Sequence, residues 1–226
     1  MNWEDEGFLL SKRKFRENAN IVNVFTSLFG KVSGIVYGGN SRKIRNYLQI
    51  SNKIFIFYST KNINKIGYFK TELIEAISPK YFDDKIRTTA LLSLSSLLNV
   101  LLPDSQPYKN VYNSLNDLIN NLNSKSWIIP YIYWELNLLK ELGFDPNLKN
   151  FMKEIKYSNN LIIIKIDSIK YQVPNFLIDN NKNDNIDSNS IKAALNFTRN
   201  LMLNKFFLPN NLMFPKSRIL LENYFN

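Results

Sequence analysis

The side chains with the clearest chemical potential in this sequence are cations gathered near its N-terminal end. Twelve of the 29 Lys and Arg residues lie between Lys12 and Lys70, together with one of the 19 acids, Glu17. The rest of the chain holds 17 bases and 18 acids, so the net charge of +10 resides in this one segment. A compositional drift toward lysine would act along the whole chain. A concentrated cationic region instead favours a polyanionic partner, most often nucleic acid.

Two clusters dominate the segment, Lys12-Arg13-Lys14-Phe15-Arg16 and Arg42-Lys43-Ile44-Arg45, and we place both at turns that leave strands. Clustered Lys and Arg side chains neutralise phosphates, and neighbouring aromatic rings offer stacking surfaces to nucleobases. The alternative is a solvated surface above ordinary core aromatics. The predicted nucleic-acid-binding residues are Lys12, Arg13, Lys14, Arg16, Lys31, Arg42, Lys43 and Arg45, and the candidate stacking residues are Phe15, Tyr37 and Tyr47.

The sequence offers little material for catalysis. It contains no Cys and no His, which excludes a serine triad with histidine, a thiol nucleophile and a thiolate or imidazole metal site. The acids in Glu4-Asp5-Glu6 and Asp83-Asp84 are adjacent and therefore point in different directions. The glycines of Gly38-Gly39-Asn40-Ser41 lack the spacing of a phosphate-binding P-loop. We predict no enzyme activity, no catalytic residue, no cofactor and no metal.

Turn residues divide the first part of the chain into short apolar runs at intervals of about ten residues, a spacing typical of a small barrel. Gly34 falls inside the third run, where a closing barrel needs a bend or a bulge, and Gly30-Lys31 reads as a hairpin turn. Five such strands favour an oligonucleotide-binding (OB) barrel that ends near Ser78-Pro79. The predicted strands are Gly7 to Ser11, Asn20 to Ser27, Val32 to Tyr37, Lys53 to Ser59 and Ile66 to Ile77.

After Pro79 the hydrophobic period changes from about two to about 3.6, as expected where strands give way to helices. One helix should stop at Pro103. Another should be capped by Ser126, carry Pro130 in its first turn and stop at Gly143. The remaining predicted elements are a helix over Val111 to Leu122, a hairpin of Leu161 to Ile166 and Ile169 to Val173 around Asp167-Ser168, and helices over Ser190 to Phe207 and Phe214 to Phe225.

These elements predict an α+β protein in which a five-stranded OB-fold barrel precedes an α-helical domain with a small hairpin insertion. We place the nucleic-acid-binding domain at residues 1–79 and the helical domain at residues 80–226. The acidic start of the chain, Glu4 to Glu6, does not suit a secretory leader, and the longest uncharged apolar stretch is shorter than the roughly 20 residues of a bilayer span. We therefore expect a cytoplasmic protein with no membrane partner.

Several stretches also resemble a known family, the bacterial recombination mediator RecO. The similar residues in the barrel part are Trp3 to Ser11, Glu17 to Val22, Phe29-Gly30-Lys31 and Tyr37 to Arg45 followed by Leu48-Gln49. Those in the helical part are Leu101-Leu102-Pro103, Trp134-Glu135-Leu136 and Leu138 to Phe144. The resemblance covers roughly residues 3 to 148.

The resemblance implies a non-enzymatic protein of the nucleoid that binds single- and double-stranded DNA and anneals complementary strands. It further implies partners: RecR, the acidic C-terminal tail of single-strand-binding protein on the helical domain, and RecA indirectly, which is loaded onto DNA. Many members of the family carry a four-cysteine zinc element just after the segment that matches Gly143-Phe144. Here the region of about residues 151–174 contains no thiolate, and we predict that an apolar hairpin replaces the metal.

The residues alone leave two alternatives open. A phosphate-tracking groove does not by itself distinguish DNA from RNA, so an OB-fold module for RNA or tRNA fits the same pattern. A structural adaptor, in which the charge is incidental and the helical part matters most, is a third class. Comparing the affinities for matched DNA and RNA strands would distinguish a DNA-binding from an RNA-binding protein. Nucleic-acid binding that is absent or insensitive to salt would favour the structural adaptor.

Overall fold

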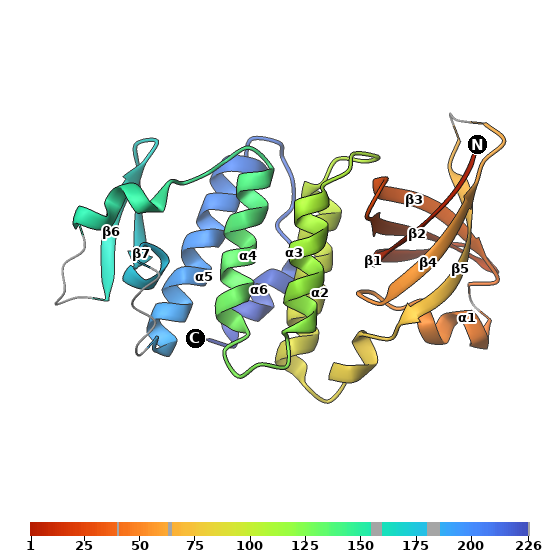
Figure 1. The fold of residues 1–226 in the computed structure, drawn as a ribbon, viewed down its shortest axis with the longest axis horizontal. Coiled ribbons are helices and arrows are strands. Elements are labelled where there is room, and N and C mark those ends of the chain that lie inside the picture. The colour runs from red at the N-terminus through yellow and green to blue at the C-terminus, as the bar shows by residue number, and fades with distance from the viewer. Residues whose placement is uncertain (40, 63–64, 155–159, 180–185, 226) are drawn as a thin grey trace. The chain divides into compact units, whose positions relative to one another are not determined.

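A closed five-stranded barrel forms the N-terminal part of the chain (Figure 1). The computed structural model describes residues 1–39, 41–62, 65–154, 160–179 and 186–225. The barrel strands are β1 (Asn2–Arg16), β2 (Ala19–Thr26), β3 (Gly30–Tyr37), β4 (Lys53–Ser59) and β5 (Gly67–Glu75). Their order is β1-β2-β3-β5-β4, and a short parallel pairing of β3 with β5 completes the closure. The predicted OB-type barrel is confirmed.

Alternating apolar residues fill the barrel interior. Leu9, Val22, Val24, Ile54 and Ile56 are each fully buried in one cluster, because in a strand every second side chain points to the same face. The same alternation places Ala19, Ile21 and Ile35 in a second cluster on the other face. The apolar runs of the sequence therefore became strands because their period matches a closed sheet with a packed core.

Two glycines have roles other than the predicted ones. Gly34 is not at a bulge: it pairs regularly with Val22, and a Cβ there would lie 2.4 Å from the ring of Phe69, so its role is close packing inside the barrel. Gly30 is not in the hairpin turn either. It begins β3 with a φ of +71°, and the turn lies just before it, at residues 27–29. Glycine is favoured at such a left-handed φ because it has no Cβ.

Helices make up most of the chain beyond the barrel. They are α2 (Lys85–Leu101), α3 (Lys109–Asn120), α4 (Ile128–Glu141), α5 (Ser188–Met202), which continues into a π-helical turn at Leu203–Phe207, and α6 (Lys216–Asn223). Short 3-10 helices cover Ser78–Tyr81, Leu148–Glu154 and Asn175–Leu177. The predicted stops hold, since α2 ends before Pro103 and α4 ends before Gly143, which has a φ of +96°.

One predicted helix cap is wrong. Ser126 does not cap α4: the N-cap position is Trp127, which has a helical φ and ψ and makes no side-chain capping bond. The turn at residues 125–127 already leads into the helix. The Ile129 N–H donates to the backbone carbonyl oxygen of Ser126 and not to its hydroxyl. Pro130 does lie in the first turn, where its missing N–H costs little.

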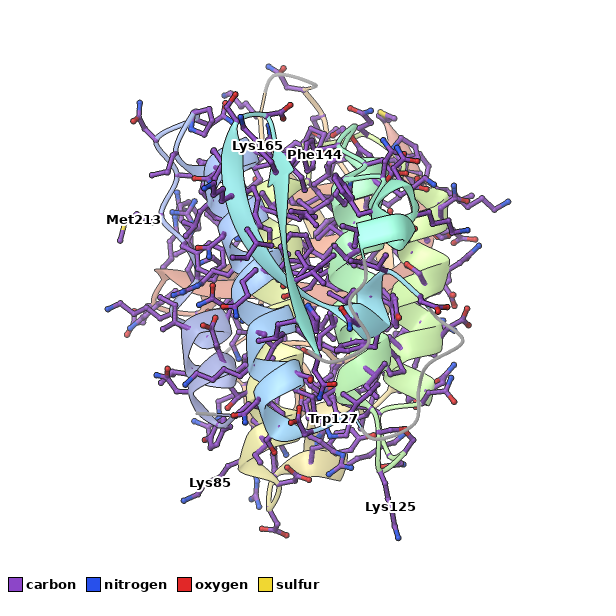
Figure 2. All side chains as sticks on the ribbon, turned by 90° about the vertical axis from the view of Figure 1, so that its left-hand side faces the viewer. Lys85, Lys125, Trp127, Phe144, Lys165 and Met213 are labelled. Carbon is purple, nitrogen blue, oxygen red and sulfur yellow. The ribbon has the colours of Figure 1, made fainter. Side chains whose placement is uncertain are left out.

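A two-stranded hairpin stands where the sequence predicted it, formed by β6 (Leu161–Ile166) and β7 (Ile169–Pro174). Figure 2 shows both strands, with Lys165 of β6 labelled. Asp167 and Ser168 have φ values of +45° and +70°, as a two-residue turn between twisted strands requires. Tyr171 of β7 packs its ring against Phe197 of α5 at 5.7 Å, so apolar packing anchors the hairpin.

The chain divides into two compact units. The first comprises residues 1–113 with 215–221, and the second comprises residues 114–214 with 222–226. The barrel and α2 thus belong to one unit, while the hairpin, α4 and α5 belong to the other, where α4 and α5 run side by side (Figure 1). The change from strands to helices does fall near Pro79, and the domain boundary we drew there stays a prediction.

Candidate nucleic-acid interface

The first basic cluster lies on a strand, whereas the sequence predicted a turn. β1 continues through Arg16, and its last residues pair with the beginning of β2, for example Arg13 with Ile21 and Arg16 with Ala19. The apolar pattern of β1 stops at Leu10, but pairing with the apolar strand β2 keeps the backbone extended. Irregularities between Leu9 and Ser11 and between Lys14 and Arg16 bend this part of β1. All five residues of the cluster are exposed.

Cross-strand pairing aligns the arginines of this cluster with aromatic residues on the outer face of the barrel. One row runs from Arg13 through Ile21 and Ile35 to Tyr68, across four strands. The next row runs from Arg16 through Ala19 to Tyr37. Residues directly opposite each other point to the same face, so both rows share one surface. We call this surface the arginine–tyrosine face; its members are Arg13, Arg16, Ala19, Ile21, Ile35, Tyr37 and Tyr68.

The two tyrosines at the end of these rows form a stacked pair. Their ring centroids are 5.5 Å apart and the ring planes differ by 20°. Tyr37 is 55% exposed and Tyr68 is 42% exposed, so one side of the pair faces solvent. Tyr37 was among the predicted stacking residues. Tyr68 was missed, although its place in the fifth apolar run, next to Gly67, marked it as an aromatic in a strand.

The second basic cluster lies on a short helix, α1 (Arg42–Tyr47), whereas the sequence predicted a turn that leaves a strand. Ser41 begins the helix by accepting a hydrogen bond from the Ile44 N–H. Ile44 and Tyr47 pack against the barrel core, which orients the helix. The remaining face of α1 then projects its cations to solvent: Arg42, Lys43 and Arg45 are all exposed.

The other two predicted stacking residues have different surroundings. Tyr47 is half-buried, and its hydroxyl donates to the Thr71 carbonyl oxygen at 2.7 Å. It therefore holds α1 onto the barrel and presents no open ring. Phe15 is 42% exposed and lies 5.3 Å beneath the guanidinium of Arg16, a cation–π contact.

The structure brings the two basic clusters together. Lys12 Nζ donates to the Leu48 carbonyl oxygen at 2.7 Å, at the C-terminal end of α1. Partial burial of the Lys12 ammonium in this contact lowers its pKa, and the charge of Arg45 lowers it further. The like charges of β1 and α1 therefore repel each other. The bond that brings the two elements together joins residues 36 positions apart in the sequence, Lys12 and Leu48.

Lys31 does not join them. It is 9% exposed, and its ammonium donates to the Asn99 carbonyl oxygen at 2.8 Å and pairs with Asp104 at 3.2 Å. These contacts tie β3 to the end of α2 and leave the ammonium engaged within the protein. Lys31 is therefore not among the exposed cations of the barrel.

Two acids at the start of β1, Asp5 and Glu6, serve the fold. Asp5 is 6% exposed and accepts hydrogen bonds from Ser27 Oγ and the Leu28 N–H, so it fixes the turn between β2 and β3. Glu6 forms an ion pair with Lys53 at 2.7 Å. Along β1 itself, acids therefore stand at the start of the strand and basic residues at its end.

In the part of the chain that the structure describes, no group of three or more Asp or Glu side chains is arranged to hold a metal ion. Among the same residues, no helix has the length and apolar character needed to cross a membrane.

Two protein-family models match this chain. The family model described as "Recombination protein O N terminal" matches residues 1–77, which include the whole barrel, and "Recombination protein O C terminal" matches residues 83–153. The chain belongs to the RecO family. The matched part of the RecO C-terminal model ends before β6, so the β6–β7 hairpin lies outside both matches.

Named relatives agree with the RecO assignment. The chain is 29% identical to "DNA repair protein RecO" of Wolbachia pipientis wMel, over 98% of this chain and 99% of that protein. It is 33% identical to the RecO of Wolbachia sp. subsp. Drosophila simulans (strain wRi), over 66% of this chain. The chain spans 62% of the length of that relative. Among solved structures, Entamoeba histolytica asparaginyl-tRNA synthetase matches 75% of this chain and 39% of its own, at 13% identity and a TM-score of 0.32.

Proposed function

We propose that this protein is a non-enzymatic recombination mediator in DNA repair, which binds single- and double-stranded DNA with its barrel and anneals complementary strands. With RecR it would assist the loading of RecA onto DNA coated by single-strand-binding protein. It would do so in the cytoplasm, at the nucleoid. The observation that carries the proposal is the juxtaposition of two basic clusters with a stacked, half-exposed tyrosine pair on a barrel of the RecO family.

The proposed DNA site combines the arginine–tyrosine face with the exposed cations of α1. Guanidinium groups suit phosphates because they offer donors in a fixed fork, and Arg13, Arg16, Arg42 and Arg45 supply four of them. Gathering like charges is unfavourable in the free protein. Burial is the main cause of the lowered pKa of Lys12, and the charge of Arg45 adds to it. Bound phosphates would relieve that repulsion. Phosphate contacts position a protein without reading sequence, as a mediator acting on any break requires.

Annealing needs no covalent step and no catalytic group. Two strands repel each other through their phosphates, and a cationic surface that holds both lowers this repulsion. Stacking on Tyr37 and Tyr68 would separate nucleobases of a bound strand from the adjacent bases of the same strand. The separated bases could then pair with the complementary strand. The positively charged end of the barrel would therefore accelerate the encounter of the two strands. Base pairing itself supplies the specificity for the complementary sequence.

Protein partners are proposed to bind the helical part, residues 80–226. RecR and the acidic, apolar-ended tail of single-strand-binding protein are the expected ligands there, as in the family. Such a tail requires an apolar surface bordered by a few Lys or Arg side chains. The test is binding of the labelled tail peptide to the full protein, with and without a saturating DNA oligonucleotide. Competition between the two ligands would show that the tail occupies the barrel instead.

The experiment that tests the main proposal follows annealing of two complementary fluorescent DNA strands, with and without bound single-strand-binding protein. We expect acceleration in both cases, and a matched pair of RNA strands serves as comparison. An RNA preference would favour the RNA-binding alternative. No acceleration, together with no salt-dependent DNA binding, would overturn the proposal.

A further inference from the structure

A cavity of about 300 Å³ lies in the barrel-containing unit, beside the proposed DNA site. Its apolar part is formed by Ile50, Phe82, Leu91 and Leu92, and Lys12 is also among its lining residues. Ligand pockets begin at about this size, so the space suits one flat group of a few rings and is too small for a folded segment.

The walls of this cavity are fixed by hydrogen bonds. Ser51 is 3% exposed, and its hydroxyl bonds to Ser95 Oγ at 2.8 Å and to the Leu91 carbonyl oxygen at 3.1 Å. Thr88 Oγ1 donates to the Tyr81 carbonyl oxygen at 2.5 Å. The cavity is therefore formed before any ligand arrives, which reduces the entropy lost on binding.

Two large apolar side chains of the cavity are exposed. Phe82 is 60% exposed and Leu92 is 40% exposed. Phe82 lies in the connection between the 3-10 helix Ser78–Tyr81 and α2, so its ring is not part of a helix or strand core. An exposed ring beside an apolar cavity can contact a planar ligand on a face that the fold does not use.

The charges around the cavity favour an anionic ligand on one side. Lys12 belongs to the basic cluster of β1, and its ammonium donates to the Leu48 carbonyl oxygen at the end of α1, the helix that carries Arg45. The acids nearest to Phe82 in sequence are Asp83 and Asp84, and Asp84 is ion-paired with Arg87 at 2.5 Å. Phosphates would therefore be held at the Lys12 side, and the uncharged part of the ligand would enter toward Phe82.

We infer that this cavity is a nucleobase pocket, in which one base of a bound single strand leaves the strand's stack and packs against Phe82 while its neighbouring phosphate meets Lys12. The inference rests on the proposed function, because it extends the path of the DNA from the two basic clusters to the start of α2. Base-stacking on a single aromatic ring contributes about 1 to 3 kcal/mol, so the pocket would add affinity without adding phosphate contacts.

The test compares Phe82→Ala with the wild type on two single strands of equal length, one normal and one built of abasic residues. Both strands carry the same phosphates. We expect Phe82→Ala to weaken binding of the normal strand roughly 5-fold or more, the lower end of the stacking range, and to leave binding of the abasic strand unchanged. The salt dependence should be the same for both proteins, because no phosphate contact is lost.

Leu28→Ala is the matched control, since Leu28 is an exposed apolar residue (64%) in the turn that Asp5 fixes, away from the basic clusters. It should bind both strands like the wild type. Circular dichroism and thermal melting verify folding of each variant. A second measurement uses strands that carry 5-iododeoxyuridine: ultraviolet irradiation should crosslink them to the peptide that contains Phe82.

The inference is overturned if Phe82→Ala binds the normal strand as the wild type does, or weakens both strands equally, or if no crosslink reaches the Phe82 peptide. Failure of the proposed function looks different: the wild type would then show no salt-dependent DNA binding at all. If Phe82→Ala instead weakens only the tail peptide of single-strand-binding protein, the cavity is a protein-docking site and the nucleobase assignment is wrong.

Discussion

Lys12 Nζ donates a hydrogen bond of 2.7 Å to the carbonyl oxygen of Leu48. The bond joins the basic end of β1 to the C-terminal end of α1. Cationic side chains are favourable near a helix C-terminus because the last carbonyl groups carry partial negative charge. This contact offsets part of the repulsion between Lys12 and Arg45 and keeps two clusters that are distant in sequence in one basic region.

Replacing Arg42, Lys43 and Arg45 together by Ala should weaken DNA binding and flatten its salt dependence. If about five cations of the two clusters meet phosphates, the logarithm of affinity for a single strand should fall with the logarithm of salt concentration at a slope near −3 to −4. The triple variant should reduce the slope by about 2, at roughly 0.7 per contact. Fluorescence anisotropy over a range of salt concentrations measures this slope.

The control for that variant is Lys165→Ala, Lys170→Ala and Lys192→Ala combined, which removes three exposed cations from the other compact unit. It changes the net charge equally and should leave the slope as it is. Exposed charges contribute little to stability, so both triple variants should fold. A slope that is unchanged in the α1 variant, with folding verified by circular dichroism, would place the DNA path elsewhere.

Lys31 should matter for stability and not for DNA binding. Lys31→Met keeps an unbranched stem but removes an ammonium that donates to the Asn99 carbonyl oxygen and pairs with Asp104. Because a hydrogen bond from a charged donor is lost, the free energy of unfolding should fall by about 1 to 3 kcal/mol. Urea denaturation measures it. Asp104→Asn, at a 73% exposed side chain, should have a much smaller effect. A reduced salt slope in Lys31→Met would return Lys31 to the interface.

The sequence predicted the elements of the fold better than the surroundings of single side chains. The barrel strands follow from local alternation, which any closed sheet must satisfy. The basic residues from Lys12 to Arg16 show no such alternation, and only pairing with β2 makes them a strand. α1 is six residues long, too short for a helical period to be visible.

Long-range contacts explain what remained hidden. Lys31 is engaged by Asn99, 68 residues away, and Tyr68 meets Tyr37 only because β3 and β5 close the barrel. The charge of a segment is a property of its sequence. Which of its cations face solvent depends on partners that the tertiary fold supplies.

Asp84 should stabilise α2 in a pH-dependent way. Its carboxylate caps the helix by accepting from the Arg87 N–H at 2.9 Å, and this bond, with smaller help from the Arg87 guanidinium, lowers the pKa of Asp84 below its ordinary value of 3.8. A lowered pKa means that the unfolded chain binds the proton more tightly. The stabilisation is therefore present at neutral pH and is lost as pH falls through the pKa of the folded state.

Asp84→Ala should accordingly cost about 1 kcal/mol at pH 7, and this difference from the wild type should shrink below about pH 4. Asp84→Asn keeps a capping oxygen and should cost less. Chemical denaturation at pH 7 and in acid measures both variants. A difference between Asp84→Ala and the wild type that stays constant down to pH 2 would contradict a role for the carboxylate charge.

Gly34→Ala should destabilise the barrel by steric overlap. Its Cβ would lie 2.4 Å from the ring of Phe69, which is 4% exposed and cannot move freely inside the core. Overpacking of this kind costs about 1 to 3 kcal/mol. In a double-mutant cycle, Phe69→Leu should make the Gly34→Ala substitution less costly, because it removes the ring that the methyl group meets. Additive costs of the two substitutions would show that the overlap is relieved in another way.

Tyr68→Ala should weaken single-strand binding without altering its salt dependence. The ring stacks on Tyr37 at 5.5 Å and leaves one side of the pair to solvent, so its loss removes stacking surface and no positive charge. We expect a roughly 5-fold or larger drop in affinity for a normal strand and an unchanged salt slope. Tyr68→Phe keeps the ring and should bind nearly as the wild type. Because the two rings act as a pair, Tyr37→Ala combined with Tyr68→Ala should weaken binding by less than the sum of the single effects. Wild-type affinity in Tyr68→Ala, with the fold intact by circular dichroism, would remove the tyrosine pair from the DNA path and leave the cations of β1 and α1 as its remaining support.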